Sequence, residues 1–267
     1  MIATLDVIGP KKGIKNRLKG IFSAKKPIII KKSYLSYGYT AIYIPAGRKA
    51  GLKKRFCSAL HDAKIGKDDL LIPSNDFPVS LFPGNNFVTK CEELRARMLL
   101  NFLKSSLKNA KNPRKNNILI IDKRANAVSA AAELISLCNV YVCTDRFDLY
   151  RPCAEYCFQK YGDAPKKDDK FVSICAAFAP FGREGVLLPN SSTPVLSPIE
   201  QEGFSLSACF LSEFLTGQIP ENIANDIFLE GMLKKFCAPE ILEYTPESLV
   251  FQGIAASTDS FAEKFFQ

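Results

Sequence analysis

The chain has 267 residues, of which 47% are hydrophobic, and its 36 lysines and arginines exceed its 27 acidic residues to give a formal net charge of +9. This composition can bury one large core or two modest ones, which excludes wholesale disorder. No window reaches the roughly 18 consecutive apolar residues of a membrane helix, and the start lacks the basic-then-apolar order of a secretory signal, so we expect a cytoplasmic protein without a membrane partner.

The cysteines and the single histidine restrict the chemistry. The nine cysteines are odd in number and scattered, without a C-x-x-C, as is typical of free thiols in a reducing compartment. Cys153 and Cys157 share one face of a predicted helix, but no further ligands have a suitable spacing, and no metal site is predicted. Any histidine-dependent triad would have to use His61, which disfavours the common hydrolase mechanisms.

Positive charge is concentrated in the first half of the chain. Residues 1–116 contain 24 Lys and Arg against 7 Asp and Glu, a net +17, whereas residues 117–267 carry a net −8. This asymmetry indicates two regions of different charge or a basic partner-binding face.

In chain order the patterns of the first half predict a basic helix over 13–22, strands over 27–30 and 39–45, a helix over 49–64, a short strand over 70–73, a loop over 73–86, and a long helix from the Thr89–Glu92 capping box to about Asn109.

A polar stretch over 108–117, with Pro113 in its middle, separates the two regions. The sign of the net charge changes at the same place. We therefore predict a basic α/β domain over 1–112, ending in the long helix, and a second domain over 113–267.

The second half alternates between apolar strands and helices. Its first strand is a continuous apolar run that ends in a charge, as a buried parallel strand does. The alternation predicts an α/β fold with a parallel, doubly wound sheet. The predicted elements are strands over 117–122, 140–144, 170–178, 185–189 and 248–252, helices over 125–138, 151–162, 206–216 and 221–236, and a terminal turn or helix over 261–266.

The turn Asp122-Lys-Arg-Ala-Asn-Ala127 follows the first of these strands, and Asp145 follows the second. Over about residues 116–190 this order resembles the opening of Rossmann NAD(P)-binding domains. The resemblance implies NAD or NADP as cofactor, with Asp145 on the ribose 2′-hydroxyl or Arg146 on a 2′-phosphate. The sequence departs from that family in lacking G-x-G-x-x-G, and Asp122 stands where it would repel a pyrophosphate.

The order of the two domains carries a second resemblance. A small α/β domain followed by a Rossmann-like domain is similar in layout to shikimate-dehydrogenase-like oxidoreductases. The catalytic residues of that family cannot be matched to positions of this sequence, so the reaction and the catalytic residues stay open.

The first hypothesis is a Rossmann-like protein that binds a nucleotide or another anionic small molecule between its two regions. Lys123 or Arg124 would hold the anion and Asp145 a hydroxyl, while Gly182 lies in the loop after the third strand, where open α/β sheets bind ligands. The alternative is a non-catalytic interaction or regulatory protein with a degenerate Rossmann core. The candidate binding residues are Asp122, Lys123, Arg124, Asn126, Asp145, Arg146 and Gly182.

A third hypothesis is nucleic-acid binding through the basic N-terminal region. Basic groups neutralise phosphates and aromatic rings stack on bases. Solvated lysines around a packed strand explain the same pattern without a ligand. The residues concerned are Tyr34, Tyr37, Tyr39 and Tyr43 beside Lys31, Lys32, Arg48 and Lys49.

Overall fold

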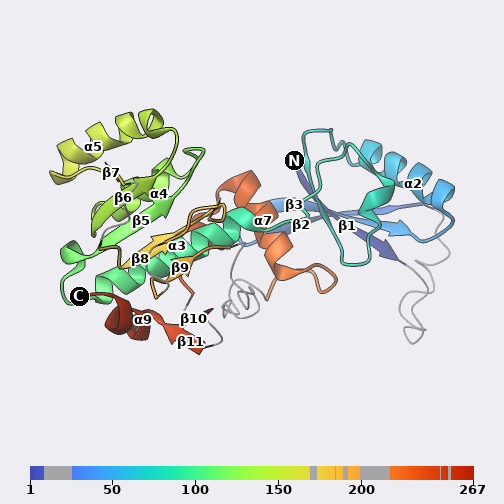
Figure 1. Cartoon of the computed structure of the whole chain (residues 1–267). Coiled ribbons are helices and arrows are strands. Elements are labelled where there is room, and N and C mark those ends of the chain that lie inside the picture. Colours follow the sequence, from blue (N-terminus) through green and yellow to red (C-terminus); the bar gives the residue numbers. More distant parts are fainter. Residues whose placement is uncertain are drawn as a thin grey trace. The chain divides into compact units, whose positions relative to one another are not determined.

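The computed structural model in Figure 1 describes residues 1–8, 26–168, 173–183, 185–188, 192–198, 217–246, 248–251 and 254–267. The chain forms two compact units. The first consists of Met1–Cys91 and Ser212–Ile241, and the second of Glu92–Leu211 and Leu242–Gln267. The predicted helices over 13–22 and 206–216 lie outside the described residues.

The first unit is built on a four-stranded sheet. Its strands are β1 (Ile2–Ile8), β2 (Ile28–Tyr34), β3 (Tyr37–Pro45) and β4 (Leu70–Pro73), in the order β2-β3-β1-β4. β1 is parallel to both of its neighbours, and β2 is an antiparallel edge strand that a two-residue turn joins to β3. The carboxyl ends of β1, β3 and β4 therefore meet at one edge of this sheet.

A helix covers each face of this sheet. On one face, Leu52 and Phe56 of α2 (Lys49–Asp62) belong to the same buried cluster as Leu5 and Ile42. On the other face lies α7 (Asn225–Phe236), where a methyl group at Gly231 would collide with Ile72 of β4. The absence of a side chain at Gly231 thus lets the helix approach the sheet closely.

The second unit contains a five-stranded sheet in which every pair of strands is parallel. Its strands are β5 (Asn117–Ile121), β6 (Asn139–Cys143), β7 (Lys166–Lys167), β8 (Ala176–Phe178) and β9 (Val195–Leu196), in the order β7-β6-β5-β8-β9. This confirms the predicted α/β class with a parallel sheet in the second half. Residues Ile118 to Ile121 of the central strand β5 are fully buried, as their continuous apolar run predicts.

The described helices of the second unit surround this sheet. α4 (Val128–Leu134) packs on β6 and on α5 (Arg151–Tyr161), and α3 (Glu92–Asn109) packs on α9 (Thr258–Phe265). α5 ends at Gly162, whose φ of 73° is the left-handed conformation that terminates many helices. The second unit also contains the hairpin β10 (Ser248–Phe251) and β11 (Ile254–Ser257) and the 3₁₀ turns η2 (Pro113–Lys115) and η3 (Phe147–Tyr150). The 3₁₀ turn η1 (Val79–Leu81) belongs to the first unit, as does the short helix α8 (Pro239–Leu242) up to Ile241.

The two units divide the chain differently from the predicted domains 1–112 and 113–267. Glu133 of α4 accepts hydrogen bonds from Arg97 (2.5 Å) and Lys104 (2.6 Å) of α3, and Phe102 packs edge-on against Phe261 at 5.5 Å between ring centroids. These contacts place α3 in the second unit. α7 returns to the first unit because its apolar face packs on the first sheet.

Several predicted elements are shorter in the structure. The helix predicted over 125–138 is reduced to α4, because Asp122 to Ala127 form the turn that leads into it. The described part of the strand predicted over 170–178 is β8, and residues 185–188 are not in a strand. Within the described part of the chain, no helix is both long and apolar enough to cross a bilayer.

Candidate functional site

The turn between β5 and α4 is closed by the side chain of Asp122. This carboxylate is 1% exposed, and it accepts the backbone N–H groups of Asn126 (3.0 Å) and Ala127 (2.7 Å). The hydroxyl of Tyr150 also donates to it at 2.7 Å. The chain's own carboxylate therefore occupies the space in front of these two amides.

The local sequence explains why Asp122 turns inward. Ala127 is the N-cap residue of α4 and has no side-chain oxygen with which to cap the helix. The carboxylate instead satisfies the amides and meets the positive end of the helix dipole. Burial and the neighbouring Asp122 raise the pKa of Tyr150 far above its ordinary value, so this hydroxyl keeps its proton and remains a donor.

The other predicted binding residues lie in this turn, in the segment after β6 and in the turn after β8. The ammonium group of Lys123 is 3.3 Å from a carboxylate oxygen of Asp145, so the structure brings these two together as an ion pair. Arg146 Nε lies 3.7 Å from Asp148. Gly182 is in the turn after β8; its φ is 89°, and its N–H group donates a hydrogen bond to the carbonyl oxygen of Ala179. Arg124 and Asn126 have exposed side chains.

Ala125 gives the turn a measurable strain. Its φ of 59° lies in the left-handed region, which costs a residue with a side chain about 1–2 kcal/mol. Ala125→Gly is therefore expected to raise the free energy of unfolding by about 0.5–1 kcal/mol, after the higher unfolded-state entropy of glycine is subtracted. Urea unfolding would measure this change, with Ala130→Gly inside α4 as a control that loses about 1 kcal/mol. A destabilised Ala125→Gly variant would contradict the strained geometry.

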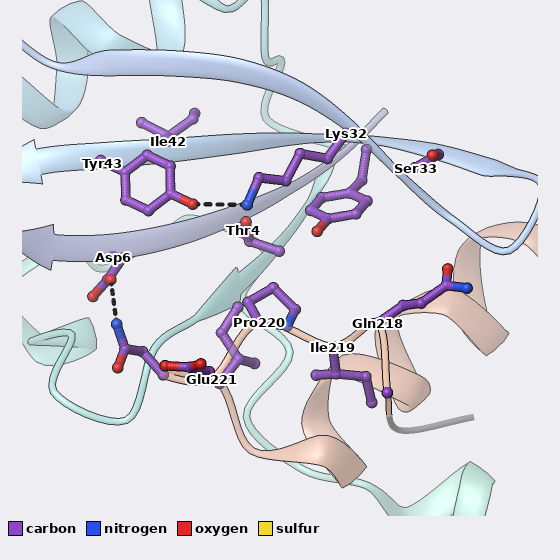
Figure 2. A pocket seen from close by; sticks show the side chains of 14 residues that line it. Thr4, Asp6, Lys32, Ser33, Ile42, Tyr43, Gln218, Ile219, Pro220 and Glu221 are labelled. Atoms are coloured by element: carbon purple, nitrogen blue, oxygen red, sulfur yellow. Dashed lines mark hydrogen bonds between the residues drawn. The ribbon is translucent and has the colours of Figure 1, made fainter. Parts of the chain in front are cut away.

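A second candidate site is a pocket of about 520 Å³ in the first unit (Figure 2). The register of the sheet pairs Thr4 with Ala41 and Asp6 with Tyr43, which puts these side chains on the α7 face. The helix α7 begins only at Asn225, and the segment before it borders the pocket. The lining residues are Thr4, Asp6, Lys32, Ser33, Tyr39, Ile42, Tyr43 and Gly217 through Ile223.

Polar pairs organise the wall of this pocket. The Lys32 ammonium donates to the Tyr43 hydroxyl at 3.0 Å, and the Asn222 amide donates to Asp6 at 2.9 Å, as the dashed lines in Figure 2 show. The hydrogen bond that Lys32 donates to the Tyr43 hydroxyl raises the pKa of Lys32 above its ordinary value, so Lys32 stays an ammonium at neutral pH. Burial raises the pKa of the Tyr39 phenol, which therefore stays neutral.

Sequence reasoning missed this pocket, although one signal was present. Thr4 and Asp6 are polar residues two apart in the otherwise apolar strand Ile2–Ile8, so both lie on one face. Asn222, the hydrogen-bond partner of Asp6, is 216 residues further along the chain, and no local pattern connects the two.

The tyrosines of the nucleic-acid hypothesis have other roles in the structure. Tyr34 and Tyr39 are buried against Phe228, with ring centroids 5.0 and 5.5 Å away. Tyr37 stacks on Phe236. The buried rings of Tyr34 and Tyr39 therefore offer no stacking surface for bases, whereas Tyr37 and Tyr43 are half-buried.

No clustering of three or more metal-ligating side chains occurs among the described residues. The eight cysteines that the structure describes are free thiols. Cys153 and Cys157 lie 3.8 Å apart between their sulfur atoms. Burial raises the pKa of Cys153 to about 12, which keeps that thiol protonated.

Comparisons with known proteins give a distant likeness to a solved structure. No family model matches the sequence. No curated protein matches it either. Among solved structures, the chain is similar to a shikimate dehydrogenase in complex with NADP+, over 100% of this chain and 96% of that one, with 10% identity and a TM-score of 0.32. This solved structure belongs to the family whose two-domain layout the sequence resembles.

Proposed function

We propose that the protein binds a small hydroxylated molecule with one anionic group in the pocket of the first unit. The observation that carries this proposal is the ammonium of Lys32, held at the wall of the pocket by Tyr43. The pocket lies along the α7 face of the parallel strands β1 and β3, between Thr4 and Asp6 of β1 and Tyr39 and Tyr43 of β3.

The lining suits this class of ligand. Lys32 supplies a cation for a carboxylate or phosphate, and the hydroxyl groups of Tyr39 and Tyr43 supply neutral hydrogen-bonding groups. Asp6 and Glu221 accept hydrogen bonds from hydroxyl groups. The volume of about 520 Å³ falls within the range of sites for small molecules.

A nucleotide at the β5–α4 turn is the less favoured alternative. Lys123, Arg124 or Arg146 would then hold its phosphates and Asp145 its ribose, with Asn126 and Gly182 nearby. Binding there requires the buried carboxylate of Asp122 to release two amides and a tyrosine hydroxyl. The geometry therefore favours a second unit with a Rossmann-like core in which the carboxylate of Asp122, rather than a bound phosphate, accepts the amides of this turn.

A thermal-shift screen tests the proposal. We expect a stabiliser among small hydroxy acids and sugar phosphates, with the shift lost in Lys32→Met. Lys31→Met is the matched control, because Lys31 directly precedes Lys32 in β2 and its side chain lies on the face of the sheet away from the pocket. Equal shifts in both variants would contradict the proposal. A stabiliser confined to NAD, NADP, ATP or S-adenosylmethionine, and lost in Asp145→Asn, would favour the alternative.

A further inference from the structure

The charges that line the pocket of the first unit do not balance. Among the described residues of this lining, Lys32 supplies the positive charge, whereas Asp6 and Glu221 supply negative ones. The lining therefore carries one more negative charge than positive. A ligand whose only charge is negative would gain from Lys32 but would be repelled by both carboxylates.

The protein does not neutralise either carboxylate. Asp6 accepts a hydrogen bond from the amide of Asn222 at 2.9 Å, and this amide carries no charge. The ion pairs between described residues involve neither Asp6 nor Glu221. Asp6 is half-buried, so its unpaired charge is more costly than one at the open surface. A positive group of a ligand would remove this cost.

The positive and negative groups of the pocket belong to different strands. Lys32 is on the edge strand β2, and its ammonium is held at the hydroxyl of Tyr43 on β3. Asp6 is on β1, where the register pairs it with Tyr43. Neighbouring strands are about 4.8 Å apart, so the Lys32 ammonium and the Asp6 carboxylate are separated by roughly the width of one strand. Glu221 comes from the segment before α7 rather than from the sheet (Figure 2).

A ligand with a charge of each sign at its two ends satisfies this arrangement. Its anionic group would accept hydrogen bonds from Lys32, and an ammonium group would donate to Asp6 and Glu221. Hydrogen bonds between charged groups are roughly twice as strong as those between neutral ones, so an ammonium gains more from these carboxylates than a hydroxyl does. An α-amino acid has a single carbon atom between its two charges, whereas an amino sugar phosphate has several.

We propose that the ligand of this pocket is a zwitterion of the amino sugar phosphate class. Lys32 binds the phosphate, Asp6 and Glu221 bind the ammonium, and the hydroxyl groups of Tyr39 and Tyr43 hydrogen-bond the sugar hydroxyls. This inference rests on the proposed function and narrows it, because it adds a cationic group to the hydroxylated anion.

Calorimetric titration of the full chain with a matched pair of sugar phosphates tests this ligand class. Glucosamine 6-phosphate differs from glucose 6-phosphate only in the ammonium group that replaces one hydroxyl. Near neutral pH and at constant ionic strength, the wild type should bind glucosamine 6-phosphate at least about tenfold more tightly. Lys32→Met should weaken both ligands to a similar extent, because both carry the same phosphate.

Asp6→Asn tests the ammonium end of the site. The variant keeps the size of the side chain and removes its charge, so glucosamine 6-phosphate should lose about tenfold in affinity. Glucose 6-phosphate should bind as before or more tightly, because one repulsive charge is gone, and its binding shows that the variant is folded. Asp68→Asn is the matched control. Asp68 is exposed, precedes β4 and does not line the pocket, so this variant should keep the wild-type preference.

Equal affinities of the wild type for the two sugar phosphates would overturn the zwitterion and leave the proposed function in place. Binding of a hydroxy acid without binding of either sugar phosphate would do the same. A preference that persists in Asp6→Asn, or that is lost to the same extent in Asp68→Asn, would also contradict the assignment of the ammonium to Asp6. If the wild type binds neither the sugar phosphates nor any hydroxy acid, the zwitterion and the proposed function both fail.

Discussion

Replacing Asp122 with alanine is expected to lower the free energy of unfolding of the second unit by about 3–5 kcal/mol. The variant removes a buried carboxylate that accepts two backbone amides and the Tyr150 hydroxyl. It leaves the hydroxyl of Tyr150, a fully buried residue, without that acceptor. Chemical denaturation followed by circular dichroism would measure the loss.

Asp145→Ala is the matched control for this variant. Asp145 is 72% exposed and forms an ion pair with Lys123, so its removal should cost at most about 1 kcal/mol. If Asp122→Ala lost no more stability than Asp145→Ala, the carboxylate would not be the group that closes the turn.

Replacing Phe228 with alanine is expected to destabilise the first unit by about 3–5 kcal/mol. Phe228 is fully buried, and its ring packs against the edges of Tyr34 and Tyr39 on the sheet. The loss should appear in hydrogen exchange as faster exchange of the amides of β1, β3 and β4, while β5 and β6 stay protected.

The control for this variant is Phe158→Ala. Phe158 is 64% exposed on α5, and its truncation should change stability by no more than about 0.5 kcal/mol. Unchanged exchange in β1 and β3 of the Phe228→Ala variant would show that α7 does not hold the first sheet together.

The parts of the fold that the sequence predicts well are local and strongly patterned. The apolar run Asn117–Ile121 identifies a central parallel strand, because such a strand is buried on both faces. The spacing of apolar residues likewise identifies α3 and α5. The same pattern cannot say which sheet a helix covers. It places α7 in one domain with the strands that precede it in sequence, whereas in the structure α7 packs on β4.

The candidate sites were predictable only in part. The sequence shows that the turn Asp122–Ala127 lacks the glycines of the Rossmann motif, but no pattern reports the inward carboxylate of Asp122 or the left-handed backbone of Ala125. The pocket requires residues from β1, β2 and the segment before α7 to meet. Contacts between residues so far apart in the chain follow from tertiary packing rather than from local periodicity.

The most direct test of the account is a titration of the ¹⁵N-labelled protein with NADP+, in which the amide resonances of Asn126 and Ala127 are followed. Asp122 accepts hydrogen bonds from both amides. We therefore expect neither resonance to shift at NADP+ concentrations up to about 1 mM, the scale of weak binding. Saturable shifts of both resonances at lower concentrations would show that a dinucleotide displaces the aspartate, and would contradict the account.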